Sequence, residues 1–478
     1  MANITSVASV CCLTLSLLLK EKVIFPGVDA YAASLMSYFT LQQTSIHPEC
    51  IVSPTTTDDV SITVKVLTSG TSLSPVCPFA VRSGGHSTFT GASNIQGGVT
   101  IDLRGLDAIT KNRNGSMVSV GAGATWGSVY AYLDNYNLSV VGGRTSSVGV
   151  AGLSLGGGIS YFGPRYGWTC DTVINFETVL ANGSVINANE NEHPDLLSAL
   201  RGGGNNFGIV TRVDMQSFRQ GSLWGGNVQL SMSTHDEEIA ALAEFSTRPT
   251  YDENSSLIGT FGYSGNTSFI INSMEYTKDE ANPAAFQQLL KIPSLSSTLR
   301  TTNMTDLSAE TEMLQANGMR AAYATVTISP TVEAINATVG VWNASVSSIR
   351  DIPGIVWSVV FEPLPPVIYA RHAKNNALGL DEKQNKPLMV ILLSITWSES
   401  DDDGRVSTAM RALIKDIKQE VGGLGDLDPF LYLNYAAAWQ DPIASYGQAS
   451  AEMLDKVQRE YDPKGVFANY VPGFKIPK

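Results

Sequence analysis

The chain has 478 residues, of which 43% are hydrophobic and 16% charged. A chain of this length exceeds one ordinary hydrophobic core, so two domains are expected. The formal net charge is −13. This excess of negative charge argues against a nucleic acid or an anionic membrane as partner, because no positive field exists to attract phosphate groups.

The N-terminal region carries a mostly apolar stretch, residues 7–19, which is short for a membrane span and follows no Lys or Arg. A buried or amphipathic first helix is the preferred interpretation, and a signal segment is the alternative. Nine N-x-S/T sequons favour passage through the secretory pathway. They lie at Asn3, Asn114, Asn137, Asn182, Asn254, Asn266, Asn303, Asn336 and Asn343. The sequence leaves the compartment and the oligomeric state open.

Five cysteines lie in the first 170 residues, with no C-x-x-C pair and no metal-ligand spacing, so no metal site is expected. Disulfides from Cys11 and Cys12 in the first helix to Cys50 and Cys77 would leave Cys170 as one free thiol. Reduced core cysteines are the alternative.

The predicted elements of the first 215 residues are short and separated by glycine turns. The expected helices cover residues 28–41, a capped segment after Pro54, and a segment that starts at Trp126 with Thr125 as N-cap. The expected strands cover residues 78–81, 99–103 and the segment through Val120. Residues 173–186 predict a hairpin that turns at Asn182-Gly183.

Residues 216–425 contain less glycine, and long β-rich runs alternate there with helical stretches. This pattern predicts an antiparallel sheet with helices on one face, and an α+β fold class. The last 50 residues return to short elements and glycine turns. We therefore expect a first domain made of residues 1–215 and 426–478, with residues 216–425 inserted as a second domain.

Glycine clusters occupy residues 82–87 (RSGGHS), 120–127, 141–160 and 201–211. Glycine is entropically costly, and repeated glycines at strand ends indicate a backbone that approaches a ligand and offers N–H groups to an anion. Four such clusters are what a cofactor with a pyrophosphate requires. Neither a Rossmann fingerprint nor a GxxxxGK[ST] motif is present, so a dinucleotide bound in another manner is expected.

RSGGHS, GVAGLSLGGG, RGGGNNFGIVT and the C-terminal YLNYA and YDPKGVF segments together resemble the berberine-bridge-enzyme branch of FAD-linked oxidases. This branch has a flavin domain of the vanillyl-alcohol-oxidase (PCMH) type, and the chain is most similar to its fungal, hydroxynicotine-oxidase-like members. The resemblance implies a two-part FAD-binding domain with an inserted substrate domain.

In proteins of this family the histidine of the RSGGH turn is bonded to the 8α-methyl group of the flavin, and His86 matches it. The resemblance implies that Ser83, Gly84 and Gly85 present N–H groups to the pyrophosphate and that Arg82 offers charge nearby. Further flavin contacts are implied at Ser87, Thr145, Ser146, Val148, Gly149, Gly152, Leu155, Gly156, Gly157, Gly158, Gly208, Ile209, Val210, Asn434 and Tyr435.

Many relatives bind the flavin through a second bond from a cysteine, and Thr145 stands at that position here. Cys170 does not match the motif, so one covalent bond is expected. The missing cysteine also disfavours an oligosaccharide oxidase. Three residues further on, Val148 matches a position where valine is associated with oxidases, which implies that reduced flavin reacts with O2 there.

The resemblance also places catalytic groups on the C-terminal YxNY segment, where Tyr432 and Tyr435 are the candidates. If this segment is a strand, Tyr432 and Asn434 share one face and Tyr435 points away. A tyrosine base needs a lowered pKa and a nearby cation. Candidate cations are Arg371, His372 and Lys374, and Glu362 is a possible carboxylate base that we interpret as structural.

The implied activity is that of an FAD-dependent oxidase. It would transfer a hydride from an alcohol, an amine or a ring C–H of a small secondary metabolite to FAD, with O2 as acceptor and H2O2 as product. A redox-neutral cyclase that keeps the flavin as a scaffold, and a secreted carbohydrate or alcohol oxidase, are the alternatives.

Overall fold

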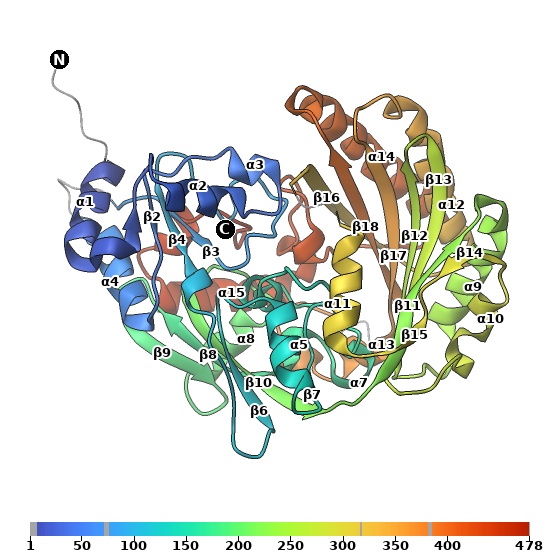
Figure 1. The fold of residues 1–478 in the computed structure, drawn as a ribbon, viewed down its shortest axis with the longest axis horizontal. Helices are drawn as coiled ribbons and strands as arrows, with labels where there is room; N and C mark the ends of the chain where they lie inside the picture. The colour runs from blue at the N-terminus through green and yellow to red at the C-terminus, as the bar shows by residue number, and fades with distance from the viewer. Residues whose placement is uncertain (1–6, 71–75, 316–317, 381–384, 478) are drawn as a thin grey trace.

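A computed structural model describes residues 7–70, 76–315, 318–380 and 385–477. Figure 1 shows two parts side by side, with both chain termini in the left part and the sheet strands of residues 223–397 in the right part. Within the described residues no helix is both long and apolar enough to cross a membrane.

The first sheet has four short strands in the order β1-β2-β4-β3, with β2, β4 and β3 parallel. Its strands are β1 (Val23–Ile24), β2 (Cys50–Val52), β3 (Phe79–Arg82) and β4 (Val99–Asp102). The accompanying helices are α1 (Val7–Leu19), α2 (Asp29–Met36), α3 (Leu41–Thr44) and α4 (Thr57–Thr68). The helix expected over residues 28–41 is therefore shorter, because the side chain of Thr40 caps a new helix by accepting a hydrogen bond from the Gln43 N–H.

The cysteines around this sheet form two disulfides, Cys11–Cys77 and Cys12–Cys50, and Cys170 is a buried free thiol. The disulfide alternative is thus confirmed over the reduced one. Both bridges connect α1 to the first sheet, because Cys50 begins β2 and Cys77 precedes β3. They compensate for a small core between short strands.

The second sheet is antiparallel and has the order β5-β6-β10-β8-β9, with β7 also paired to β10. Its strands are β5 (Ile109–Lys111), β6 (Met117–Gly121), β7 (Leu138–Val140), β8 (Val173–Val179), β9 (Val185–Asn189) and β10 (Ile209–Arg219). The helices around it are α5 (Trp126–Asp134), α6 (Val150–Leu155), α7 (Gly163–Tyr166), α8 (Pro194–Leu200) and α15 (Gln448–Tyr461), whereas α16 (Val466–Asn469) packs into the core of the first sheet. The predicted hairpin is confirmed as β8 and β9, and Thr125 caps α5 as expected.

The third sheet is antiparallel and has the order β14-β11-β13-β12-β17-β18-β16-β19, with β15 paired to β11. Its strands are β11 (Leu223–Leu230), β12 (Ser255–Ser264), β13 (Thr267–Tyr276), β14 (Ser294–Ser297), β15 (Arg300–Thr302), β16 (Arg320–Ile328), β17 (Val356–Leu364), β18 (Leu388–Trp397) and β19 (Leu427–Asp428). The associated helices are α9 (His235–Thr247), α10 (Gln287–Leu290), α11 (Met304–Met313), α12 (Val332–Ser345), α13 (Pro366–Ala370) and α14 (Asp403–Leu424). This confirms the expected α+β class.

Three helices cover the outer face of the third sheet, and one helix lies on its inner side. Figure 1 shows α9, α12 and α14 on its outer side, and their apolar side chains form one core cluster with residues of the sheet. α11 lies on the other side, between the sheet and α5. Asp134 at the end of α5 accepts hydrogen bonds from the backbone N–H and the hydroxyl of Thr305 in α11. The inner face of the sheet is therefore free to line a site against the other part of the chain.

Candidate cofactor and substrate site

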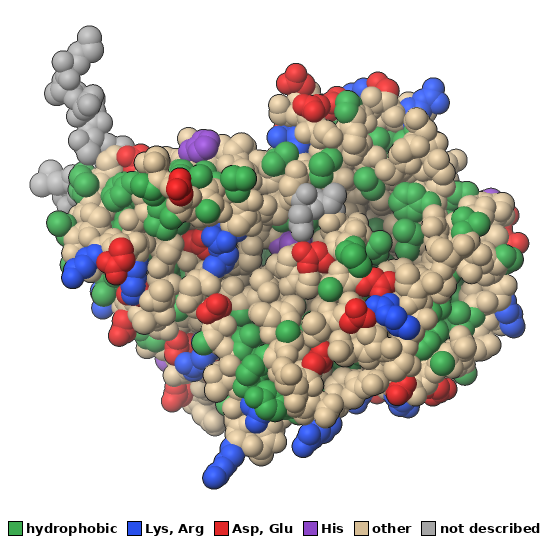
Figure 2. Space-filling model, viewed as in Figure 1, with side chains coloured by type: hydrophobic (Ala, Val, Ile, Leu, Met, Phe, Trp, Pro, Cys, Tyr) green, Lys and Arg blue, Asp and Glu red, His purple; other side chains and the backbone are tan. Residues whose placement is uncertain are grey.

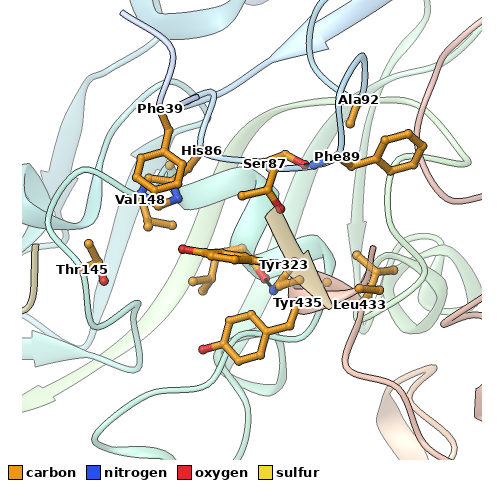
Figure 3. Close-up of a pocket in the computed structure, with 18 of the residues that line it drawn as sticks. Phe39, His86, Ser87, Phe89, Ala92, Thr145, Val148, Tyr323, Leu433 and Tyr435 are labelled. Atoms are coloured by element: carbon orange, nitrogen blue, oxygen red, sulfur yellow. Dashed lines mark hydrogen bonds between the residues drawn. The ribbon is translucent and has the colours of Figure 1, made fainter. Parts of the chain in front are cut away.

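A cavity of about 480 Å³ lies between the glycine loops and the inner face of the third sheet. Its walls come from segments far apart in the sequence, including the turn after β3, the loop before α6, five strands of the third sheet and the segment at 432–436. Figure 3 shows His86 and Phe39 on one side of this space, with Tyr323 and Tyr435 on the other.

The turn after β3 presents its backbone to the cavity. Within the described residues, the N–H groups of residues 84–87 donate no hydrogen bond. Gly85 has φ +75°, and a Cβ there would lie 2.7 Å from Arg82 Nε, so only glycine fits. Unpaired N–H groups next to a cavity are a site for an anion.

The glycine loops also pack against one another. A Cβ on Gly84 would lie 2.5 Å from the nitrogen of Gly149, and a Cβ on Gly149 would lie 2.3 Å from the nitrogen of Gly84. Gly152, in contrast, has no atom within 4 Å of the position a Cβ would take. The glycines at 84 and 149 thus bring two ligand-facing loops together, and Gly152 leaves room on the cavity side.

The ring of His86 stacks on Phe39, with 3.9 Å between centroids and 11° between planes. Its Nε2 is buried and has no hydrogen-bond partner. Burial lowers the pKa of the imidazole to about 4, so the ring is neutral at physiological pH. A neutral, unpartnered imidazole nitrogen is available as a nucleophile or as a donor to a ligand.

Arg82 does not supply charge to the cavity, and this expectation is wrong. Its side chain is fully buried behind the turn, where its guanidinium donates to the carbonyl oxygens of Ser34 and Ser37, at 2.7 Å each. It also lies over the ring of Tyr38 and 3.8 Å from Asp102. Four partners hold the arginine in the core, where it supports the turn from below.

The expected contact residues divide into two groups. The cavity is lined by Ser83, Gly84, Gly85, His86, Ser87, Thr145, Val148, Gly149, Gly152, Leu155, Gly156, Gly208, Ile209, Val210, Tyr432, Asn434 and Tyr435. Arg82, Ser146, Gly157 and Gly158 do not line it.

The three residues other than Arg82 lie behind the cavity for local reasons. The Ser146 N–H donates to the Ser308 carbonyl in α11, and its hydroxyl donates to Glu312. Gly157 and Gly158 turn the chain away after α6, and the Gly158 N–H donates to the hydroxyl oxygen of Tyr432.

The segment at Tyr432 is not the strand that the sequence analysis assumed. Residues Leu433–Tyr435 form a 3₁₀ turn, in which the Tyr435 N–H donates to the Tyr432 carbonyl. Residues three apart share a face in such a turn. Tyr432 and Tyr435 therefore meet with their ring centroids 4.8 Å apart, edge to face, so the prediction that Tyr435 points away is wrong, whereas Asn434 does contact Tyr432.

The two tyrosines have different surroundings. The hydroxyl oxygen of Tyr432 accepts hydrogen bonds from the N–H groups of Gly158 and Ile159 and from the Asn434 side chain. It thereby anchors the loop after α6. Tyr435 instead donates its hydroxyl proton to Glu362 Oε1 at 2.8 Å.

Arg144 completes this cluster and was missed by the sequence analysis. Its Nη2 donates to both carboxylate oxygens of Glu362 at 2.9 Å and to the Tyr435 oxygen at 2.6 Å. A single arginine directly after the apolar, glycine-containing run 138–143 is the signal that the sequence offers for it. Arg371, a proposed cation, instead pairs with Glu253 at the surface.

Burial raises the pKa of Tyr435 well above its usual range, Arg144 opposes this effect, and Glu362 adds to it. The lowered tyrosine pKa that the sequence analysis required is therefore absent. Tyr435 keeps its proton and can only exchange it along a hydrogen bond, whereas Glu362 is a carboxylate that can receive one.

The residues at this site fit FAD. The N–H groups of residues 84–87 suit a pyrophosphate, and the unpartnered Nε2 of His86 suits a ring held beside it. Apolar lining side chains that belong to the core around the first sheet suit an adenine, namely Val81, Leu103, Ile209, Phe467 and Val471. Fold and site together thus define a flavin-dependent oxidoreductase.

Comparisons with known proteins agree. A family model described as an FAD binding domain matches residues 48–189. An FAD-dependent monooxygenase of Fusarium proliferatum is 37% identical over 94% of this chain and 88% of its own length. A protein of Diaporthe leptostromiformis named an oligopeptidase is 40% identical over 96% of this chain, which spans only 37% of that protein.

Solved structures share the fold. Berberine bridge enzyme from Eschscholzia californica superposes with a TM-score of 0.79 at 17% identity, over 98% of this chain and 99% of that one. Glucooligosaccharide oxidase from Acremonium strictum gives 0.78 at 20% identity, over 99% and 100%. The chain belongs to the family of FAD-dependent oxidoreductases that the Fusarium relative represents, and its fold is that of berberine bridge enzyme, which confirms the expected fold.

Proposed function

We propose that the protein is an oxidase that carries FAD on His86 and oxidises an alcohol, an amine or a ring C–H of a small organic molecule from fungal secondary metabolism. The observation that carries this proposal is that His86 and the Tyr435–Glu362–Arg144 cluster line one cavity. A cofactor-binding nitrogen and a proton-accepting group there share a single enclosed space.

The structure of glucooligosaccharide oxidase is described as containing a 6-S-cysteinyl, 8α-N1-histidyl FAD. In this chain His86 is the residue that would form the histidyl bond. Thr145 lines the cavity without a thiol, and Cys170 is buried and outside the cavity lining. One covalent bond is therefore proposed.

Bound FAD would supply the acceptor for a hydride, that is two electrons and one proton, from the substrate carbon; reoxidation by O2 would take up one further proton from solvent and give H2O2. The protein handles the remaining substrate proton. As a substrate hydroxyl gives its proton to the Tyr435 oxygen, the Tyr435 proton moves to Glu362 Oε1 along the existing hydrogen bond. Arg144 keeps both partners in place, and Glu362 ends protonated until solvent takes the proton.

The test is a panel of alcohols, amines and phenolic metabolites on purified holoprotein, read by peroxide formation in air and by bleaching of the flavin without air. Tyr435→Phe keeps the ring packed on Tyr432 and removes the proton path. It should slow bleaching about 10²- to 10⁴-fold, the usual contribution of a proton-transfer group. Product formation without anaerobic bleaching would instead indicate a redox-neutral cyclisation.

A further inference from the structure

The substrate side of the cavity is built from cross-strand rows on the inner face of the third sheet. In one row Tyr323, Ser394 and Ser358 lie opposite one another on β16, β18 and β17. In the next row Leu392, Val360 and Thr260 follow on β18, β17 and β12. The face therefore offers a hydroxyl row beside a mostly aliphatic row.

Charge on the cavity wall is confined to one compensated pair. Among the described lining residues, Arg144 and Glu362 are the only side chains of the Arg, Lys, Asp or Glu type. They are 9% and 4% exposed and lie 2.9 Å apart. His86 is neutral, because burial lowers its pKa. The side chains of the described wall therefore present no net charge to a substrate beside the sheet.

Acidic side chains behind the wall do not change this balance. Glu275 is buried, and burial raises the pKa of its carboxyl well above the usual range, so it is neutral. Glu310 pairs with Arg300, and Glu312 accepts a hydrogen bond from Ser146.

A charged substrate beside the sheet, away from the N–H groups of residues 84–87, loses its hydration without meeting an unpaired side chain of opposite charge, which is unfavourable at low dielectric. An apolar ring gains free energy by leaving water, and oxygen atoms at its edge can bond to the hydroxyl row. Building on the oxidase function proposed above, we propose that this cavity selects uncharged, ring-bearing compounds with hydroxyl or carbonyl groups at the edge. The Arg144–Glu362 pair sets this preference because its two charges cancel.

The test uses three probes on holoprotein at pH 7: 2-naphthol, 2-naphthoate and cellobiose. Binding is followed by difference spectra of the flavin and by calorimetry. The wild type should bind 2-naphthol at least about tenfold more tightly than 2-naphthoate. Cellobiose should not bind detectably. Equal binding of naphthol and naphthoate, or tight binding of the disaccharide, would overturn the proposal.

Removing one charge should change the preference. Glu362→Gln leaves Arg144 uncompensated, so the naphthoate-to-naphthol affinity ratio should rise at least about tenfold. Glu253→Gln is the matched control, because Glu253 pairs with Arg371 at the surface and its loss should leave the ratio unchanged. An unchanged ratio in Glu362→Gln would overturn the role of the pair.

Two further measurements keep the proposal testable if that variant is unstable. Arg144→Met leaves Glu362 alone and should favour the cationic 2-(aminomethyl)naphthalene over 2-naphthol; no shift would count against the proposal. Ser394→Ala should weaken the binding of 2-naphthol about 2- to 10-fold and leave the binding of 2-methylnaphthalene unchanged. An equal loss of affinity for both would show that the hydroxyl row does not bond to the ligand's oxygen. If the purified protein contains no FAD, the proposed oxidase function is refuted. The charge preference of the cavity is then still measured by calorimetry, which does not depend on the flavin.

Discussion

His86 is the residue whose replacement has the most direct chemical readout. Because its Nε2 has no partner and the residue lines the cavity, it is available to bond FAD. Denatured wild type should retain flavin fluorescence and show the mass of a single FAD adduct. His86→Ala should release all FAD on denaturation, whereas Cys170→Ser should keep the adduct. An adduct that survives His86→Ala would show that another side chain is the attachment site.

Val148 allows a separate test of the reaction with oxygen. It lines the cavity, and Figure 3 shows it beside His86 and Phe39. Val148→Ile adds one methylene where a pocket for O2 is expected, and each 1.4 kcal/mol of added barrier slows the reaction about tenfold. Stopped-flow reoxidation should slow by about tenfold or more, while anaerobic reduction by substrate stays nearly unchanged. Equal slowing of both half-reactions would mean that Val148 shapes the whole flavin site.

At the scale of elements, the contact between α9 and β13 contains a buried acid. Glu238 is fully buried and accepts a hydrogen bond from Asn272. Burial raises its pKa to about 7 against a weaker opposing effect of that bond. Its Oε1 and the Asn272 Oδ1 have no partner, which suits a protonated carboxyl.

Glu238 therefore makes stability depend on pH. Since its folded pKa lies above the ordinary value, the unfolded chain ionises first as the pH rises. The protonated carboxyl contributes its full share to the free energy of unfolding below about pH 4.5. This contribution, on the order of 3 kcal/mol, is lost as the pH rises to about 7. Glu238→Gln should remove this loss, so thermal unfolding at pH 8 should occur at a higher temperature than in wild type. The exposed Glu237→Gln should keep the wild-type dependence; an identical profile for all three proteins would refute the assignment.

At the scale of the whole molecule, two disulfides connect the first helix to the first sheet. Breaking the Cys12–Cys50 bridge by a double change to serine should lower stability by about 2 to 4 kcal/mol, because it frees a loop of 38 residues in the unfolded chain. Thermal unfolding measures this effect. Cys170→Ser is the control, since Cys170 forms no bridge. Equal losses in the two variants would show that packing of the cysteines, and not the bridge, matters.

The bridges and the sequons also bear on the compartment, for which we propose the secretory pathway. Disulfides persist in oxidising compartments. Seven of the sequon asparagines are exposed, at Asn114, Asn137, Asn182, Asn266, Asn303, Asn336 and Asn343. Figure 2 shows acidic and basic side chains scattered over one face without a basic cluster. A mass loss of the native protein on enzymatic deglycosylation would support the proposal, and unmodified asparagines would contradict it.

The sequence by itself determined the family, the fold class and the turn that carries His86. Glycine is required where backbones touch, as at Gly84 and Gly149, so these sites leave a local pattern that one chain displays. Alternation of apolar residues likewise indicated the third sheet.

Only the tertiary structure decided which polar groups act together. Arg144, Glu362 and Tyr435 are separated by up to 291 residues, and no local pattern reports that they meet. Tyr435 was assigned to the wrong face because a four-residue segment does not distinguish a strand from a 3₁₀ turn. Arg82 was assigned to the cavity because a charge next to a glycine turn suggests an anion, whereas its partners in the folded chain come from α2 and the residues just after it. Local backbone geometry is encoded in neighbouring residues, but the pairing of buried charges depends on which distant segments the fold brings into contact.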